Sequence, residues 1–191
     1  TFDGFAVQLL VSSMTADPAG FARVPLMYRA LDNDQYDEIA PLLNGFRAQF
    51  AAFRGMPEAM DLASGATAAR LALTNREAET SLLGDALNFP MPHVMGVRPQ
   101  FDLGDDFRAP FRSDIPALFI SGTLDGRTYP DEAAEETKGF SNRRRLIVEN
   151  GGHNIYEADK RVADAVVAFF KGEPTPETIV FAPPVIAKPP A

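Results

Sequence analysis

Two side chains that can transfer protons stand shortly after two short apolar runs. Asp125 follows the run Ala117–Ile120, and His153 follows Leu146–Val148, 28 residues later in the chain than the aspartate. A carboxylate can accept a hydrogen bond from the imidazole Nδ1–H, which fixes the tautomer of the ring and stabilises the imidazolium formed during proton transfer. The pair therefore indicates catalysis in which the histidine acts as a general base toward a nucleophile.

Both apolar runs have the pattern of strands that are buried on both faces of a parallel sheet. Each is short, uninterrupted and closed by turn residues, Ser121-Gly122 after the first and Asn150-Gly151-Gly152 after the second. Helices are predicted after each strand, over Asp131–Gly139 and Glu157–Phe170, and this order implies parallel strands joined by right-handed crossovers. Because functional groups in such sheets gather past the carboxyl ends of the strands, we expect the acid and the histidine on one rim.

The first hundred residues have a helical character and little strand signal. Residues Asp37–Phe53 form the clearest predicted amphipathic helix, with apolar residues three and four positions apart at Ile39, Leu42, Leu43, Phe46, Phe50 and Phe53. Further helical segments are predicted over Phe21–Leu31, Ser64–Leu73 and Arg76–Leu87, followed by a proline-rich connection over Asn88–Arg112. We therefore predict a helical lid region and connection over residues 1–112, an α/β core segment over 113–172 and a proline-rich tail over 173–191.

The predicted core segment is incomplete as a sheet. Two strands that are buried on both faces also need neighbours along their edges, and the helical half supplies none. We therefore expect an α/β fold class in which the sheet is completed by an N-terminal segment outside this sequence.

Composition narrows the function classes. The 191 residues carry 26 acidic and 18 basic side chains, a net charge of −8, which disfavours binding to a phosphate backbone. There is no cysteine and there are only two histidines, so thiolate nucleophiles, disulfides and multi-histidine metal centres are excluded, and no metal or organic cofactor is implied. The longest apolar stretches, such as Phe5–Val11, are too short to cross a bilayer.

The segments around the two candidate residues resemble a known fold family. Ile115–Pro130 followed by Arg145–His153 is similar to the closing segment of the α/β-hydrolase fold, in which the acid and the histidine follow late strands. More narrowly, Ser121–Thr128 and Val148–His153 resemble bacterial tripeptidyl- and prolyl-aminopeptidase-like hydrolases. Two further stretches look like parts of the helical cap of that group and its exit, Met60–Gly65 and Leu103–Pro110.

The resemblance implies a serine hydrolase, with Asp125 orienting His153 and with the chain order Ser, Asp, His. The family places its nucleophile in Gly-x-Ser-x-Gly, and this motif is absent here, since neither Ser64 nor Ser121 has those flanks. We therefore expect the C-terminal part of such an enzyme, inactive without the partner segment or chain that carries the nucleophilic serine. The resemblance favours an aminopeptidase, and a bacterial periplasmic or secreted location. An ester hydrolase of the same fold and a non-catalytic binding fragment stay open.

Each singled-out residue also has a simpler interpretation. Asp125 can form an Asx-turn with its own backbone, and His153 can be a surface histidine in a glycine-rich turn. His93 has no evident partner nearby in the sequence, which favours a structural or exposed role. A chain that starts at Thr1 allows an N-terminal-nucleophile hydrolase, but that fold needs long antiparallel strands, and the start of this chain offers only one short candidate.

Overall fold

A computed structural model describes residues 3–51 and 55–188 of the chain. The chain forms two compact units, each described here by itself. The helical unit comprises Thr1–Ser13 and Ala30–Ala109, and the sheet unit comprises Met14–Arg29 and Pro110–Ala191. None of the helices in the described ranges is long and apolar enough to cross a bilayer.

The helical unit contains α1 (Gly4–Met14), α4 (Tyr36–Ala51), α5 (Met56–Ser64), α6 (Ala68–Ala78), α7 (Met91–Val94), the 3₁₀ turn η1 (Pro99–Phe101) and α8 (Gly104–Arg108). Ile39 and Leu43 of α4 are fully buried, as expected for its apolar stripe, whereas Leu42 on the neighbouring row is half exposed. The predicted end of this helix at Phe53 lies outside the described residues, and only the backbone of Phe50 is described.

Two predicted helices of this unit differ from the structure. The predicted helix Ser64–Leu73 is interrupted, because α5 ends at Gly65 with φ of 58° and α6 begins after Thr67, whose hydroxyl accepts a hydrogen bond from the Arg70 amide. The predicted helix Arg76–Leu87 is also wrong beyond Ala78, where turns replace it. Side-chain hydroxyls there bond to the local backbone, as in the contact from the Leu83 amide to Ser81 Oγ, and so compete with helical bonding.

Among the residues that the structure describes, the sheet unit has three parallel strands in the order β1-β2-β3, with helices between them. Its elements are α2 (Pro18–Phe21), the start of α3 (Val24–Asp32), β1 (Ala117–Gly122), α9 (Pro130–Glu136), η2 (Thr137–Gly139), β2 (Arg143–Glu149), α10 (Ile155–Ala158), α11 (Lys160–Phe170) and β3 (Thr178–Val180). The predicted strands and the helix after the first strand are present. The predicted second helix is divided at Asp159, whose carboxylate caps α11 by accepting the Arg161 amide.

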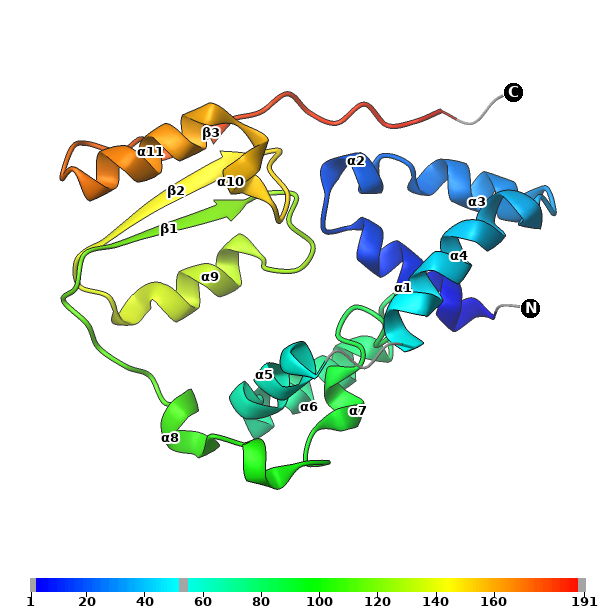
Figure 1. Ribbon diagram of the computed structural model, residues 1–191, viewed down its shortest axis with the longest axis horizontal. Coiled ribbons are helices and arrows are strands. Elements are labelled where there is room, and N and C mark those ends of the chain that lie inside the picture. The colour runs from blue at the N-terminus through cyan, green and yellow to red at the C-terminus, as the bar shows by residue number, and fades with distance from the viewer. Residues whose placement is uncertain (1–2, 52–54, 189–191) are drawn as a thin grey trace. The chain divides into compact units, whose positions relative to one another are not determined.

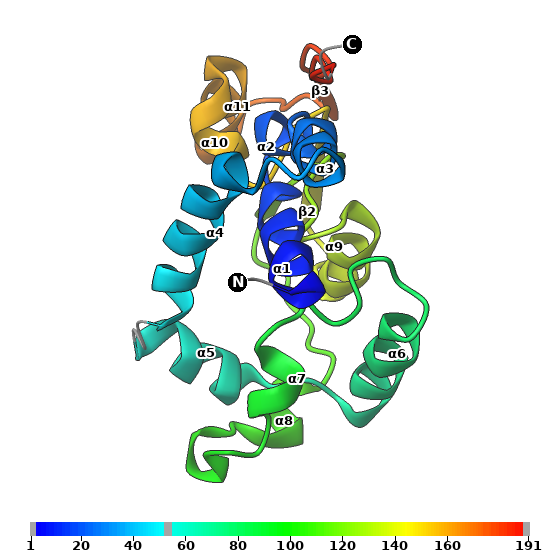
Figure 2. The same ribbon diagram turned by 90° about the vertical axis from the view of Figure 1, so that its right-hand side faces the viewer.

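Helices cover both faces of this sheet, with α11 on one side and α9 on the other (Figures 1 and 2). Because side chains alternate along a strand, Leu146 and Val148 of β2 point to the α11 face, where they pack in one buried cluster with Val162 and Ala165. Phe119 of β1 points to the other face, where its ring meets that of Phe140 at 5.0 Å between centroids. The predicted two-sided burial is found only in part, because Leu146 and Val148 are fully buried whereas Ile147 and the apolar residues of β1 are half-buried.

The third strand was not predicted as a strand. Residues 173–191 were expected to form an extended tail, and within it Thr178–Val180 pairs with β2 from Ile147 to Glu149. The pairing continues beyond the strand, because the Phe181 amide donates to the Glu149 carbonyl at 3.0 Å. Part of the proline-rich tail is therefore an edge strand of the sheet.

Candidate active site

The rim at the carboxyl ends of β1 and β2 carries both predicted site residues. The register pairs Gly122 with Val148, so the two strands end side by side. The loops after them are joined by backbone bonds, from the Thr123 amide to the Val148 carbonyl at 3.0 Å and from the Leu124 amide to the Gly151 carbonyl at 2.8 Å. A Cβ atom at Gly122 would collide with the Gly151 carbonyl oxygen, so the close approach of the loops requires glycine there.

The structure brings Asp125 and His153 together. Asp125 Oδ2 lies 3.0 Å from His153 Nδ1, and the side chain of Asp125 is 6% exposed whereas that of His153 is 35% exposed. The other carboxylate oxygen, Oδ1, accepts the amides of Arg127 at 2.8 Å and Thr128 at 3.1 Å. The Asx-turn that was considered as a simpler interpretation of Asp125 is therefore present together with the contact to the imidazole.

This geometry suits proton transfer at the far side of the ring. A carboxylate accepts only, so the bond to Asp125 assigns the hydrogen to Nδ1 and leaves a lone pair on Nε2. Within the described ranges Nε2 has no hydrogen-bond partner, and the imidazole is partly open to solvent. The neutral ring is therefore oriented as a general base would be.

Tyr129 lies in the loop that follows Asp125, and its surroundings change the pKa of its phenol. Burial, followed by the negative charges of Glu132 and Asp125, raises the pKa of Tyr129 above its usual value. The phenol therefore stays uncharged at neutral pH and can act as a hydrogen-bond donor or acceptor beside the rim.

The remaining candidates have local partners. His93 belongs to the helical unit, where its Nε2 lies 2.6 Å from Asp85 Oδ2 and its ring lies tilted against that of Phe89, with 5.8 Å between the ring centroids. The partner was missed because Asp85 lies in turns that were predicted as part of the helix Arg76–Leu87. Ser64 Oγ donates to backbone carbonyls of its own helix, and Thr1 lies outside the described residues.

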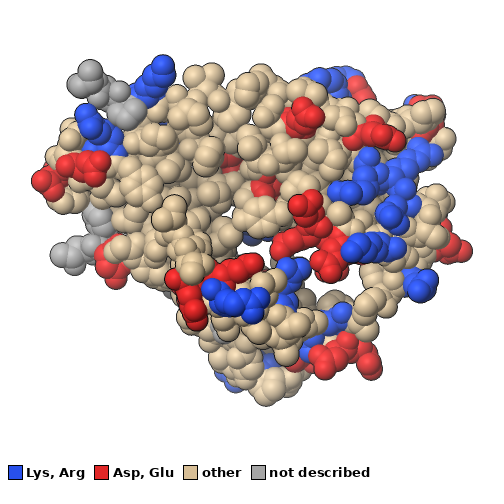
Figure 3. All heavy atoms as spheres, turned by 180° about the vertical axis from the view of Figure 1, so that it is seen from behind, with Lys and Arg blue, Asp and Glu red and all other residues tan. Residues whose placement is uncertain are grey.

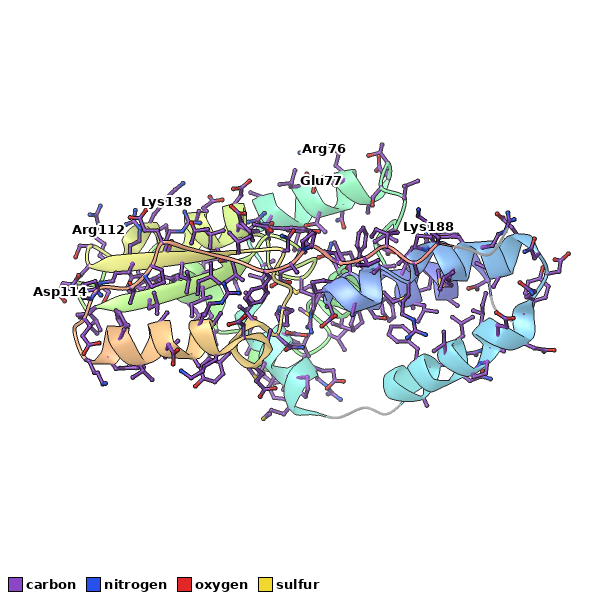
Figure 4. All side chains as sticks on the ribbon, turned by 90° about the horizontal axis from the view of Figure 1, so that it is seen from above. Arg76, Glu77, Arg112, Asp114, Lys138 and Lys188 are labelled. Atoms are coloured by element: carbon purple, nitrogen blue, oxygen red, sulfur yellow. The ribbon has the colours of Figure 1, made fainter. Side chains whose placement is uncertain are left out.

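A concave surface lies at the other end of β2, away from the rim that carries Asp125 and His153. It has a volume of about 620 Å³ and is lined by Arg143, Arg144, Arg145, Ile147, Pro174, Thr175, Glu177 and Thr178. Lys and Arg side chains gather at this end of the sheet unit, on the right of Figure 3. Arg112, Asp114 and Lys138 also project from the end where the strands begin (Figure 4).

The three arginines of this surface do not converge on a common ligand position. Their guanidinium groups donate to the carbonyls of Phe140, Glu173 and Pro130, and successive residues of a strand point to opposite faces. These side chains therefore tie β2 to two neighbouring loops and to the start of α9.

Part of the chain matches a known protein family. Residues 101–179 match the profile of a family described as TAP-like protein, within the α/β-hydrolases. The matched segment contains β1, β2, Asp125 and His153, and it supports a place for this segment in the α/β-hydrolase superfamily. No curated protein and no solved structure matches the chain.

Proposed function

We propose that this chain supplies the acid and the histidine of a serine hydrolase, and that the enzyme releases residues or short peptides from the N-terminus of its substrates. The contact between Asp125 Oδ2 and His153 Nδ1, on loops inside the segment that matches the hydrolase family, carries the proposal. The predicted lid region over residues 1–112 would set substrate choice.

In the proposed mechanism, His153 Nε2 takes the proton of a serine hydroxyl while the serine oxygen attacks the carbonyl carbon of the substrate. The protonated ring then gives that proton to the leaving amine nitrogen, and an acyl-enzyme remains. In the second half of the reaction, His153 takes a proton from water while the water oxygen attacks the acyl carbon. The ring then returns the proton to the serine oxygen, and the carboxylic acid product leaves. Asp125 stays ionised throughout, and its contact with Nδ1 stabilises the positive ring.

The serine would come from a segment or chain outside this sequence. β1 supports this, because in the described ranges it pairs only with β2, and its other edge has no strand beside it. An open edge of six residues, most of them apolar, is a site where a further strand can pair. A preceding hydrolase segment that ends its own strands at the same rim would place a nucleophile near Nε2.

A fluorophosphonate probe, which reacts with activated serines, tests the hydrolase proposal on the chain purified with every polypeptide that accompanies it. We expect labelling of a companion segment or chain, and loss of labelling in His153→Ala. His93→Ala is the matched control, because it removes the other histidine–carboxylate pair and should leave labelling intact. No labelling of an assembly that contains the companion would instead favour the non-catalytic binding fragment.

Substrate class needs a separate experiment. An aminoacyl or tripeptidyl amide should be hydrolysed faster than a p-nitrophenyl ester, and acetylation of the amine of the peptide should abolish turnover. Equal turnover of blocked and free peptides, or a preference for the ester, would favour the ester hydrolase.

A further inference from the structure

The connection from Met14, the last residue of α1, to Pro18, the first residue of α2, touches both loops that carry the candidate residues. The amide of Gly126, the neighbour of Asp125, donates to the Thr15 carbonyl at 3.1 Å. The amide of His153 itself donates to the Ala16 carbonyl at 2.8 Å. All of these residues belong to the sheet unit, and the connection lies beside the ends of β1 and β2 in Figure 1. Two consecutive carbonyls thus hold one amide from each loop.

The approach of this connection leaves no space for a side chain at position 126 or 152. A Cβ atom at Gly126 would lie 2.7 Å from the Thr15 carbonyl oxygen, and one at Gly152 would lie 2.8 Å from that of Ala16. Neither glycine has a positive φ, so the requirement for glycine is one of space and not of backbone conformation. Both glycines are direct neighbours of the candidate residues.

The connection is fixed at its other end by the start of α2. Asp17 caps this helix by accepting the Ala19 amide at 2.8 Å, and Pro18 occupies its first position. Gly20 lies against the Met14 carbonyl, where a Cβ atom would come within 2.8 Å of the oxygen. The carbonyls of Thr15 and Ala16 are therefore presented by a compact turn.

We infer that residues 14–18 are a positioning element that sets the distance and angle between Asp125 and His153. The inference rests on the proposed function. Both bonds join main-chain atoms, so the effect of the connection on Asp125 and His153 passes through the two loop backbones. Catalytic groups need placement to within a fraction of an ångström, and two bonds to one rigid turn supply such a constraint.

Gly126→Ala and Gly152→Ala test this inference in the chain with its companion segment. Each added methyl group should push the connection away from its loop and loosen the contact between Asp125 and His153. We expect kcat to fall about 100-fold with KM nearly unchanged. The ¹⁵N spectrum of the imidazole should show loss of the single Nδ1–H tautomer. Thr15→Gly combined with Gly126→Ala should restore part of both signals, because it removes the side-chain part of the collision.

Gly172→Ala is the control, since Gly172 ends α11 with φ of 74° and substitution there strains the sheet unit away from the rim. Wild-type kcat and tautomer in both loop variants, or equal losses in the control, would overturn the inference. Should the variants not fold, hydrogen exchange in the unaltered chain decides, because fast exchange of the His153 and Gly126 amides contradicts the two bonds. If the positioning role is contradicted, serine labelling that depends on His153 would still support the proposed function, so the two proposals are tested separately.

Discussion

The two units differ in where their apolar side chains lie. In the sheet unit, Leu146, Val148 and Val162 are fully buried in one cluster that joins β2 to α11. In the helical unit, α5 and α6 contain no buried residue, and Leu82 in the turns after them is 95% exposed. Short helices gain most of their stability from packing of an apolar face. The contrast teaches that the candidate site stands beside a buried cluster, whereas α5 and α6 have none, although Ile39 and Leu43 of α4 are buried elsewhere in the helical unit. Function and stability should therefore respond differently to changes in the two places.

The largest expected effect is a difference in kcat between variants of the two carboxylate–histidine pairs, Asp125–His153 and Asp85–His93. Asp125→Asn in the sheet unit should lower kcat about 10⁴-fold, because an amide in place of the carboxylate favours the wrong imidazole tautomer. Asp85→Asn, which breaks the corresponding contact to His93 in the helical unit, should leave kcat close to wild type. Steady-state kinetics on the assembled enzyme measures both. Similar losses in the two variants would contradict the placement of the site in the sheet unit alone.

A matched pair of leucines tests the difference in packing. Leu146→Ala should reduce the free energy of unfolding by about 2–5 kcal/mol, because it leaves a cavity in a closed core. Leu82→Ala should change it by less than about 0.5 kcal/mol, because its side chain loses almost no contacts. Urea denaturation followed by circular dichroism measures both. A large effect at Leu82 would mean that this side chain is covered in solution.

A smaller effect concerns acid stability. Hydrogen bonds from the Arg161 side chain and amide lower the pKa of Asp159 from 3.8 to about 2. A carboxyl group whose pKa is lower in the folded state stabilises the fold above its unfolded value, and that contribution is lost as the pH falls through the folded value. The Tm of the wild type should therefore exceed that of Asp159→Asn above pH 4, and the gap should shrink as the pH approaches about 2. A gap that is constant with pH would contradict this.

The counterpart in the helical unit is Asp102. Hydrogen bonds from Arg108 and from the Gly104 amide lower the pKa of Asp102, so Asp102→Asn should also show a gap that closes in acid. Because the helices around Asp102 bury few side chains, we expect a smaller change in Tm than at Asp159. The same thermal scans measure both variants.

The parts of the fold that the sequence predicted have strong local signals. The strands at Ala117 and Leu146 are uninterrupted apolar runs closed by glycine, and two such runs in parallel order place Asp125 and His153 on one rim without further information. The strand Thr178–Val180 has only three residues and lies in a proline-rich segment, so its pairing depends on β2 and leaves little trace in the sequence.

The backbone contacts around the site could not be predicted in the same way. A backbone carbonyl is chemically the same in every residue type, so the sequence does not mark the carbonyls of Thr15 and Ala16 as special. More than 100 positions also separate these two residues from the loops whose amides they bind. The glycines beside Asp125 and His153 do not indicate which segment of the chain approaches them. Long-range hydrogen bonds through main-chain atoms are set by the complete fold.

The third strand has a practical consequence for work with this protein. Besides pairing with β2, the tail is fastened to the turn before His153, because Asn150 Nδ2 donates to the Phe181 carbonyl at 2.9 Å. A chain shortened at Gly172 would release that turn and uncover the edge of β2, and open edges associate with strands of other molecules. Shortened versions should therefore precipitate during purification, and an affinity tag at this end should be attached beyond the strand.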